Sequence, residues 1–477
     1  MPVRGSPPFV VLGGGPCGLA AAWHLARGGH KPIVLEREAL VGGLCATHAK
    51  HGWRFDLGGH RFVSSDHALT KWIEDVLGDD LLTRDRRSVI LHRGRRFRYP
   101  LEAGDLLRSL GPAECVWALG GYAVARAGRV LKPRDEITFE DWVTARFGTP
   151  LYDAFFGPYT EKLWGLSPAA ISADWAAERI SLLNLGDAAL RLAGLRRSPI
   201  RTYARQYRYP RHGMGQLYES IAREVERQGG EVVTSARVVG LERRGARVVA
   251  VNVETAAGSR QIPVGELLST IALPELVRAL EPRLSTSLDR SVRSLRFRAL
   301  TFLNLMLRRP EFSENTWMYV ASGALKMSRI QEPKRRSPAM APPGKTSIML
   351  EIPCDVGDRI WKASVTSLRS EFEGELRKLG FCIDDVVDAF SIRVEHGYPI
   401  YHIGYDRDRT ELLGVVERFE NVRTAGRQGL FRYVFMDAAM SMGAYAAEEM
   451  LAGTRSIRAV DAIGRARGLI EAQALTA

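Results

Sequence analysis

The stretch FVVLGGGPCGLAAAWHLARGGHKPIVLE, residues 9–36, decides the fold of the N-terminal part of the chain. The apolar run Phe9–Leu12 predicts a short buried strand, and the alanine-rich run Leu19–Leu25 predicts a helix directly after the glycines. Residues Ile33–Leu35 predict the next strand. A strand, a helix and a second strand at this spacing form a right-handed βαβ unit, so we expect a parallel sheet.

The glycine-rich turn between the strand and the helix has the pattern G-x-G-x-x-G. Gly13 permits the tight turn, Gly15 lets a pyrophosphate approach the backbone, and Gly18 lets helix and strand pack closely. The helix N-terminus, which includes Pro16, presents unpaired N–H groups to the phosphates. Glu36, at the end of the second strand, stands where a carboxylate meets ribose hydroxyls. The motif therefore predicts a dinucleotide-binding site.

A second glycine pair, Gly42 and Gly43, follows the acidic residue closely. This continuation is typical of large flavoproteins and uncommon in NAD-dependent dehydrogenases, so the sequence favours FAD as the bound cofactor. The chain carries only one such fingerprint. Any nicotinamide cofactor would therefore bind transiently.

The rest of the chain predicts an α/β fold in which a Rossmann-like FAD-binding domain is interrupted by two other regions. Leu267–Ile271 predicts a strand that re-enters the parallel sheet, and residues 231–251 predict a meander of short strands. Residues from Val422 onward predict a strand, a glycine-rich turn and a helix. The discontinuous FAD-binding domain is expected to comprise residues 1–80, 211–285 and 405–453.

Two regions are predicted outside that domain. Residues 101–200 are rich in helix formers and predict a helical insertion. Residues 81–100 and 286–404 contain apolar runs such as LTFLNLML and predict a mixed or mostly antiparallel sheet domain on the substrate side. Residues 454–477 are expected to form a basic, frayed C-terminal tail.

The composition is that of a globular protein: of 477 residues, 45% are hydrophobic and 25% charged. The five cysteines are far apart and never in a C-x-x-C arrangement, so we expect no disulfide framework, no metal site and a cytoplasmic location. No signal peptide and no transmembrane segment are predicted. The net charge of +13 indicates a solvated basic surface, an anionic ligand or a membrane surface. Without a nucleic-acid-binding motif, we expect no nucleic-acid partner.

Residues 55–62, FDLGGHRF, resemble the flavin-edge loop of the UDP-galactopyranose mutase family, especially its eukaryotic type. They resemble the loop of protoporphyrinogen oxidases and amine oxidases more distantly. In the mutases the histidine of this loop lies against the isoalloxazine ring, so the resemblance assigns that position to His60. A histidine that merely caps a turn is the alternative.

The resemblance extends over nearly the whole chain through further segments that occur in the family's order. These are Glu161–Gly165 followed by Asp174–Arg179, then Tyr209–Gly215, Trp317–Tyr319, His396–Pro399 and Gly426–Tyr433. Each motif alone is weak evidence, and the resemblance rests on their common order. Trp317 and Tyr319 share one sheet face at period two, which ordinary sheet packing also produces. Arg179 could equally form a surface ion pair.

The resemblance implies specific roles. A diphosphate would be held by Arg179, by Tyr398 and by a second cation for which Lys326 and Arg329 both qualify. The full set of catalytic residues is His60, Arg179, Trp317, Tyr319, Lys326 or Arg329, Tyr398, Arg427 and Tyr433. The expected FAD-binding residues are Gly13, Gly15, Pro16, Gly18, Glu36, Arg37, Gly42, Gly43, Leu44, Gly58, Gly59, His60, Val238, Gly426, Arg427, Tyr433 and Met436.

The family reaction interconverts the pyranose and furanose forms of a nucleotide sugar with no net redox change. It proceeds through a bond between the flavin N5 and the sugar, so the resemblance implies that reduced FAD is the active form and that NADPH or another reductant reduces it. The substrate would be an NDP-hexose. The alternative is an FAD-dependent oxidase or desaturase of the amine oxidase or protoporphyrinogen oxidase type, which removes hydride from an apolar or amine substrate.

Overall fold

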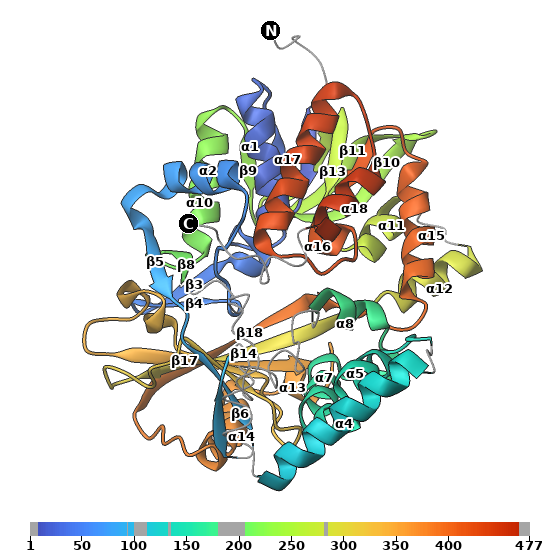
Figure 1. The fold of residues 1–477 in the computed structure, drawn as a ribbon. Coiled ribbons are helices and arrows are strands. Elements are labelled where there is room, and N and C mark those ends of the chain that lie inside the picture. The colour runs from blue at the N-terminus through green and yellow to red at the C-terminus, as the bar shows by residue number, and fades with distance from the viewer. Residues whose placement is uncertain are drawn as a thin grey trace.

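The computed structural model describes residues 8–92, 94–99, 112–131, 135–179, 206–280 and 285–466. A parallel sheet with its helices forms one part of the molecule, and a larger sheet flanked by short helices forms the other (Figure 1). Residues far apart in the sequence meet in both parts.

The parallel sheet has five strands in the order β19-β13-β1-β2-β9. Their bounds are β19 Val422–Thr424, β13 Glu266–Ser269, β1 Phe9–Leu12, β2 Ile33–Leu35 and β9 Glu231–Val233. Every neighbouring pair is parallel, so the predicted parallel sheet and the predicted re-entry of the strand near Leu267 are confirmed. The placement of residues 231–233 in the meander was wrong, because they pair with β2 in this sheet.

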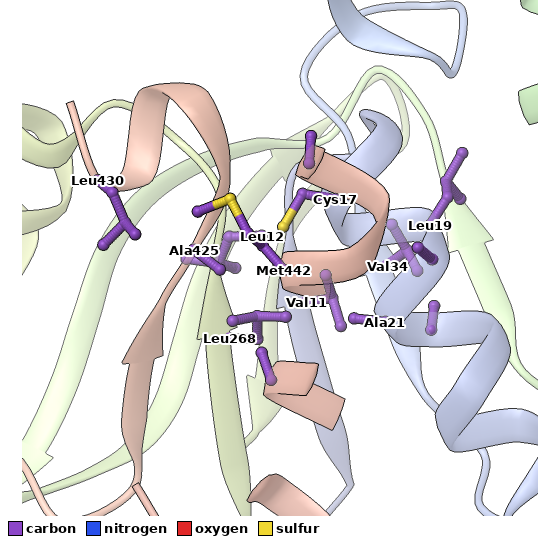
Figure 2. Close-up of a cluster of buried hydrophobic side chains, with 14 of the residues drawn as sticks. Val11, Leu12, Cys17, Leu19, Ala21, Val34, Leu268, Ala425, Leu430 and Met442 are labelled. Atoms are coloured by element: carbon purple, nitrogen blue, oxygen red, sulfur yellow. The ribbon is translucent and has the colours of Figure 1, made fainter. Parts of the chain in front are cut away.

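The core of this part lies between the sheet and helices α1 (Pro16–Arg27), α10 (Gly215–Arg227) and α17 (Met436–Ala452). Figure 2 shows Val11 and Leu268 from adjacent strands facing Met442 of α17. Helices α1 and α17 approach so closely at Gly443 that a Cβ there would lie only 2.0 Å from the carbonyl oxygen of Cys17. Only glycine fits at this position. Each fully buried valine or leucine here contributes about 1.5–3 kcal/mol.

The predicted meander is a three-stranded antiparallel sheet of β10 (Arg237–Arg244), β11 (Arg247–Thr255) and β12 (Gly258–Pro263). Helices α11 (Leu273–Leu280) and α15 (Tyr405–Glu417) pack nearby. Helix α12 (Thr286–Ser294) packs against α11 and α15. The expected boundary at residue 286 therefore separates α12 from the helices it contacts.

The larger sheet has seven strands in the order β18-β14-β17-β16-β15-β6-β7. Their bounds are β18 Val386–Pro399, β14 Phe297–Leu307, β17 Thr346–Cys354, β16 Arg329–Gln331, β15 Trp317–Val320, β6 Ser88–His92 and β7 Arg95–Arg98. All neighbours are antiparallel except β15 and β6, which confirms the predicted mixed sheet. One face is covered by α14 (Val365–Lys378), which follows the short α13 (Arg359–Lys362).

The helical insertion packs beside this sheet (Figure 1). It contains α4 (Pro112–Leu131), α5 (Phe139–Phe147), α6 (Thr149–Leu151), a π-helical turn at Tyr152–Phe156, α7 (Gly157–Trp164) and α8 (Ala173–Arg179). Thr138 and Asp141 form a capping box that fixes where α5 begins. Trp164 is buried against Trp175 and Tyr398, which joins the insertion to β18.

Shorter elements connect the parts. They are β3 (Thr47–Lys50), β4 (Trp53–Asp56), α2 (His67–Leu77), β5 (Leu81–Asp85), β8 (Gln206–Pro210), α16 (Gly426–Gly429) and α18 (Ile457–Ala466). Strand β5 pairs with β8 instead of joining the seven-stranded sheet. The expectation of a frayed tail was wrong for residues 457–466, because Asp461 of α18 accepts hydrogen bonds from Arg409 and Arg432.

Candidate functional site

The glycine-rich turn after β1 brings backbone into very close contact. A Cβ on Gly18 would lie 2.0 Å from the carbonyl oxygen of Gly13, so only glycine permits this packing of helix on strand. Gly13 has φ +98° and donates its N–H to the carbonyl of Leu35 at 2.8 Å. Helix α1 begins at Pro16 after Gly15, and no side chain caps it. Its first-turn N–H groups are therefore available to phosphate.

Glu36 is buried beside this turn and is oriented by two backbone donors. Its Oε2 accepts from the N–H of Gly14 at 2.7 Å and its Oε1 from the N–H of Glu38 at 2.8 Å. Burial raises the pKa of Glu36, and these two hydrogen bonds oppose that shift. Gly42 donates its N–H to the carbonyl of Gly14 at 2.8 Å, so the second glycine pair packs directly on the first turn. Turn, acid and second glycine pair thus form one unit.

Two further residues expected to bind the cofactor lie near this unit. The side chain of Arg37 is half-exposed and lies 3.1 Å from Glu38 and 3.9 Å from Glu395. Val238 lies on β10, two residues after Ala236, whose N–H donates to the carbonyl of Glu36.

A cavity opens where the loop after β4 and the segment after β19 meet the seven-stranded sheet. Residues from at least six separate segments line it. Those that the sequence predicted for the site are Leu44, Gly58, Gly59, His60, Tyr319, Arg329, Tyr398, Arg427, Tyr433 and Met436. The predicted flavin-edge and substrate residues therefore converge, although up to about 390 positions separate them in the chain.

His60 is partly buried in the wall of the cavity and is neutral near pH 7. Burial, and after it repulsion from Arg427, Arg336 and Arg329, together lower the pKa of His60 to about 3. Its Nδ1 has no hydrogen-bond partner among the described residues. A neutral imidazole can donate one hydrogen bond and accept another, so a bound ring would meet one donor or acceptor here.

Arg329 is held in the cavity wall by a fully buried carboxylate. Arg329 on β16 lies opposite Glu351 on β17, and its Nη1 is 3.2 Å from Glu351 Oε2. The Tyr398 hydroxyl donates to Glu351 Oε1 at 3.2 Å. Burial and the neighbouring Glu351 raise the pKa of Tyr398 well above its usual value, so this phenol stays protonated. Glu351 therefore fixes both a cation and a phenol of the cavity.

Arg427 and Tyr433 form an adjoining part of the cavity wall. The Arg427 guanidinium donates to the carbonyl of Val434 at 2.6 Å and stacks 4.3 Å from the centre of the Tyr433 ring. Tyr433 in turn stacks on Tyr398 at 5.6 Å. Gly426 has φ +83°, and a Cβ there would lie 3.0 Å from Cys17 Cβ, which ties this segment to α1.

Helix α17 begins at this wall with Met436. Phe435, the residue before it, makes no side-chain cap. Because Phe435, Met436 and Asp437 line the cavity, the positive dipole end of the helix lies beside it.

Two predicted residues, Lys326 and Trp317, lie away from the cavity, and the side-chain position of a third, Arg179, is not described. The ammonium of Lys326 lies at the surface, 2.6 Å from Glu371, so the structure does not bring it to the cavity. Trp317 is buried in the core behind the cavity wall. Arg179 is the last residue of α8, and its side chain lies outside the described residues.

Sequence reasoning missed four charged residues of the site: Arg61, Arg86 and Asp437, which line the cavity, and Glu351 behind its wall. Arg61 and Arg86 line the cavity and stack on Trp317, at 5.1 and 5.7 Å from the ring centre. Arg61 directly follows the flavin-edge histidine, and Arg86 lies in a basic run that is typical of a solvent-exposed surface. The signal for Glu351 is a lone acid in the apolar strand TSIMLEI.

The residues fit FAD. The uncapped start of α1, the close backbone contacts at Gly13 and Gly18, and the buried Glu36 suit a pyrophosphate and a ribose. The cavity at the start of α17 suits the flavin end. Together, fold and site define a flavoenzyme of the Rossmann-like, two-sheet class.

The chain belongs to the family described as flavin containing amine oxidoreductase, whose model matches residues 16–451. Curated relatives match only in part. The putative flavin-containing monoamine oxidase AofH of Mycobacterium tuberculosis is 28% identical over 50% of this chain and 52% of its own length. Chloroplastic protoporphyrinogen oxidase 1 of Arabidopsis thaliana is 27% identical over 34% of this chain and 31% of its own. The chain thus spans about half or less of the curated relatives compared here.

Solved structures match over nearly the full length. Reduced UDP-galactopyranose mutase has a TM-score of 0.79 at 20% identity, covering 98% of this chain and 99% of its own. A putative protoporphyrinogen oxidase from Exiguobacterium has a TM-score of 0.68 at 19% identity, covering 94% and 99%. At these identities the likeness concerns the fold. Among the described helices, none combines the length and apolarity needed to cross a bilayer.

Proposed function

We propose that this chain is a flavin-dependent nucleotide-sugar mutase, which interconverts the pyranose and furanose forms of an NDP-hexose without net redox change. The observation that carries the proposal is the charge of the cavity. Four arginines line it, Arg61, Arg86, Arg329 and Arg427, whereas Asp437 is the one acidic lining residue in the described part of the chain. Such a cavity favours an anionic substrate.

A nucleoside diphosphate is the leaving group that this charge would stabilise. A diphosphate released from the anomeric carbon carries two negative charges, which preorganised cations stabilise more effectively than water does. In the proposal Arg329 and Arg427 bind the diphosphate and retain it until the sugar ring has reclosed. Both guanidiniums are already oriented, by Glu351 and by the carbonyl of Val434. Little rearrangement is then needed when charge develops.

The tyrosines and the histidine would act by hydrogen bonding and by shaping the cavity. The Tyr398 hydroxyl already donates a hydrogen bond to Glu351, so its proposed role is to hold Tyr433 by stacking. Tyr319 packs against Tyr99 with ring centres 4.6 Å apart and lines the cavity, where sugar hydroxyls would lie. Reduced FAD, when bound, supplies the nucleophile for the anomeric carbon. His60, being neutral, adds no positive charge beside it.

The second candidate is an FAD-dependent oxidase or desaturase, which the names of the curated relatives favour. A cationic amine would be repelled by the four arginines, because each like charge within a few ångströms of a buried site costs on the order of 1 kcal/mol or more. An oxidase with this cavity would therefore act on an anionic or neutral substrate.

One anaerobic experiment separates the two functions. The protein is reduced with dithionite, freed of excess reductant and incubated with UDP-galactopyranose and other NDP-hexoses, and products are resolved by chromatography. We expect a furanose isomer from reduced protein, none from oxidised protein, and no consumption of oxidant. Bleaching of the oxidised flavin by one of these substrates, with no isomer formed, would assign the chain to the oxidases.

A further inference from the structure

Helix α4 exposes an apolar surface on the outside of the molecule. Val116, Val124 and Leu131 are each more than 70% exposed, and Trp117 is 58% exposed. Figure 1 shows α4 at the outer edge of the molecule, beyond α5 and α7. Side chains of this kind in the described part of the chain gather on no other helix. The surface therefore requires an explanation beyond random exposure.

The opposite face of α4 packs on the insertion through small residues. Ala118 is buried, and a Cβ on Gly121 would lie 2.4 Å from Cγ of Pro150. At 100° per residue, the outward face lies opposite this contact. Its members are Ala113, Val116, Trp117, Leu119, Gly120, Ala123, Val124, Ala127 and Leu131. The face carries no charged residue over about 30 Å, the length of a 20-residue helix.

Basic residues lie at the C-terminal end of this face. Arg126 lies at its edge, whereas Arg129 lies on the other side of the helix at 100° per residue, and the sequence continues with Lys132 and Arg134. The nearby carboxylates face other partners. Glu114 lies 2.9 Å from Arg95, whereas Glu136 pairs with Arg129 at 3.2 Å and with Arg146. An apolar face with flanking cations and an aromatic residue is the pattern of a helix that lies in the surface of an anionic membrane.

We propose that the outward face of α4 docks on an anionic lipid surface, with the helix lying in the interface. The area argues for lipid over a second copy of the chain. A face about 30 Å long and about 10 Å wide offers roughly 300 Å², whereas a stable dimer buries about 800 Å² per partner. Insertion into lipid has no such minimum area, because the apolar side chains enter the acyl boundary and Arg126 at the edge of the face reaches the phosphates.

The test is vesicle co-sedimentation of the full-length FAD-loaded protein, with phosphatidylcholine vesicles containing phosphatidylglycerol or none. The variant Val116→Glu/Val124→Glu places two charges on the outward face. The matched control, Val356→Glu/Val387→Glu, makes the same change at exposed valines outside α4. Trp117→Gln is a milder second variant. All sites are exposed, so near-UV circular dichroism and flavin content should match those of the parent protein.

We expect the parent and the control to bind anionic vesicles, more weakly as salt rises, and neutral vesicles less well. The partition coefficient should fall about a hundredfold in Val116→Glu/Val124→Glu and less in Trp117→Gln. Equal binding by parent and double variant, or no binding by the parent at low salt, would overturn the proposal. So would a dimer in solution that this variant alone dissociates, because the face would then belong to a second copy.

Discussion

The nucleotide turn and the cavity are built in opposite ways. The turn is formed by contiguous residues, and its contacts are between backbone atoms at Gly13, Gly18 and Gly42. The cavity is formed by side chains from distant segments, oriented by buried partners such as Glu351. The nucleotide turn is therefore disrupted by adding an atom, and the cavity is disrupted by removing a side chain.

The largest effect is expected for Gly18→Ala in the turn. The added Cβ would lie 2.0 Å from the carbonyl oxygen of Gly13, so α1 and β1 must separate and the phosphate site is lost. We expect little or no FAD in the purified protein, measured by absorbance near 450 nm after denaturation. Gly120→Ala is the matched control, because nothing lies within 4 Å of its added Cβ. Full flavin content in Gly18→Ala would contradict the close contact.

The next effect concerns the cavity and the buried pair of Arg329 and Glu351. Arg329→Met leaves the Glu351 carboxylate buried without its cation, which typically costs about 3–5 kcal/mol. Adding Glu351→Gln should restore most of the stability, because the charge is gone. Affinity for UDP-galactose should stay low in both variants, since neither carries the guanidinium. Urea unfolding measures the change in stability, and titration calorimetry measures the affinity for UDP-galactose. Equal stability of the single and double variants would exclude the Arg329–Glu351 pair as a stabilising contact.

The same contrast explains how much could be predicted from the sequence. The turn and its acid depend on neighbours within about 30 residues, so glycine spacing and Glu36 indicated them directly. The parallel sheet followed from the same stretch. Strand β9 was misassigned because its partner β2 lies about 200 residues away and its own three residues carry no distinguishing signal.

The cavity could be predicted only in part. Resemblance pointed to His60, Tyr398 and Arg427, which line the cavity, but it could not separate Arg329 from Lys326, since both are cations after the same strand. Pairing of β16 with β17 makes the distinction, because it sets Arg329 opposite Glu351. Helix α18 was missed for a similar reason. Its Asp461 pairs with arginines about 30 and 50 residues earlier in the chain, which its basic sequence does not reveal.

A smaller effect is expected from the charge environment of His60. The folded-state pKa of His60 is lowered to about 3 by burial and by nearby arginines, against an ordinary value of 6.5. Between these values the unfolded chain binds a proton that the folded protein excludes, so stability falls as pH falls from about 6.5 toward 3. His60→Gln removes this contribution. We expect its Tm to drop less between pH 7 and pH 5 than that of the parent protein, by calorimetry of the oxidised holoprotein; an unchanged drop would mean that His60 is protonated in the folded state.

The smallest effect is expected for Lys326→Ala, which completes the comparison between the two cations after β15. The Lys326 ammonium is about half-exposed and pairs with Glu371, which Arg359 also binds through two hydrogen bonds of 2.7 Å. Arg359 first, and then Lys326, lower the pKa of Glu371 to about 2, so loss of the lysine leaves this carboxylate ionised and still paired. An exposed pair of this kind contributes about 0–1 kcal/mol, so the free energy of unfolding should change by less than about 1 kcal/mol. Affinity for UDP-galactose should equal that of the parent protein, in the same calorimetric assay in which Arg329→Met binds weakly. A tenfold loss of affinity in Lys326→Ala with no loss in Arg329→Met would reverse the assignment, because the phosphate would then contact the lysine at the surface and not the guanidinium in the cavity.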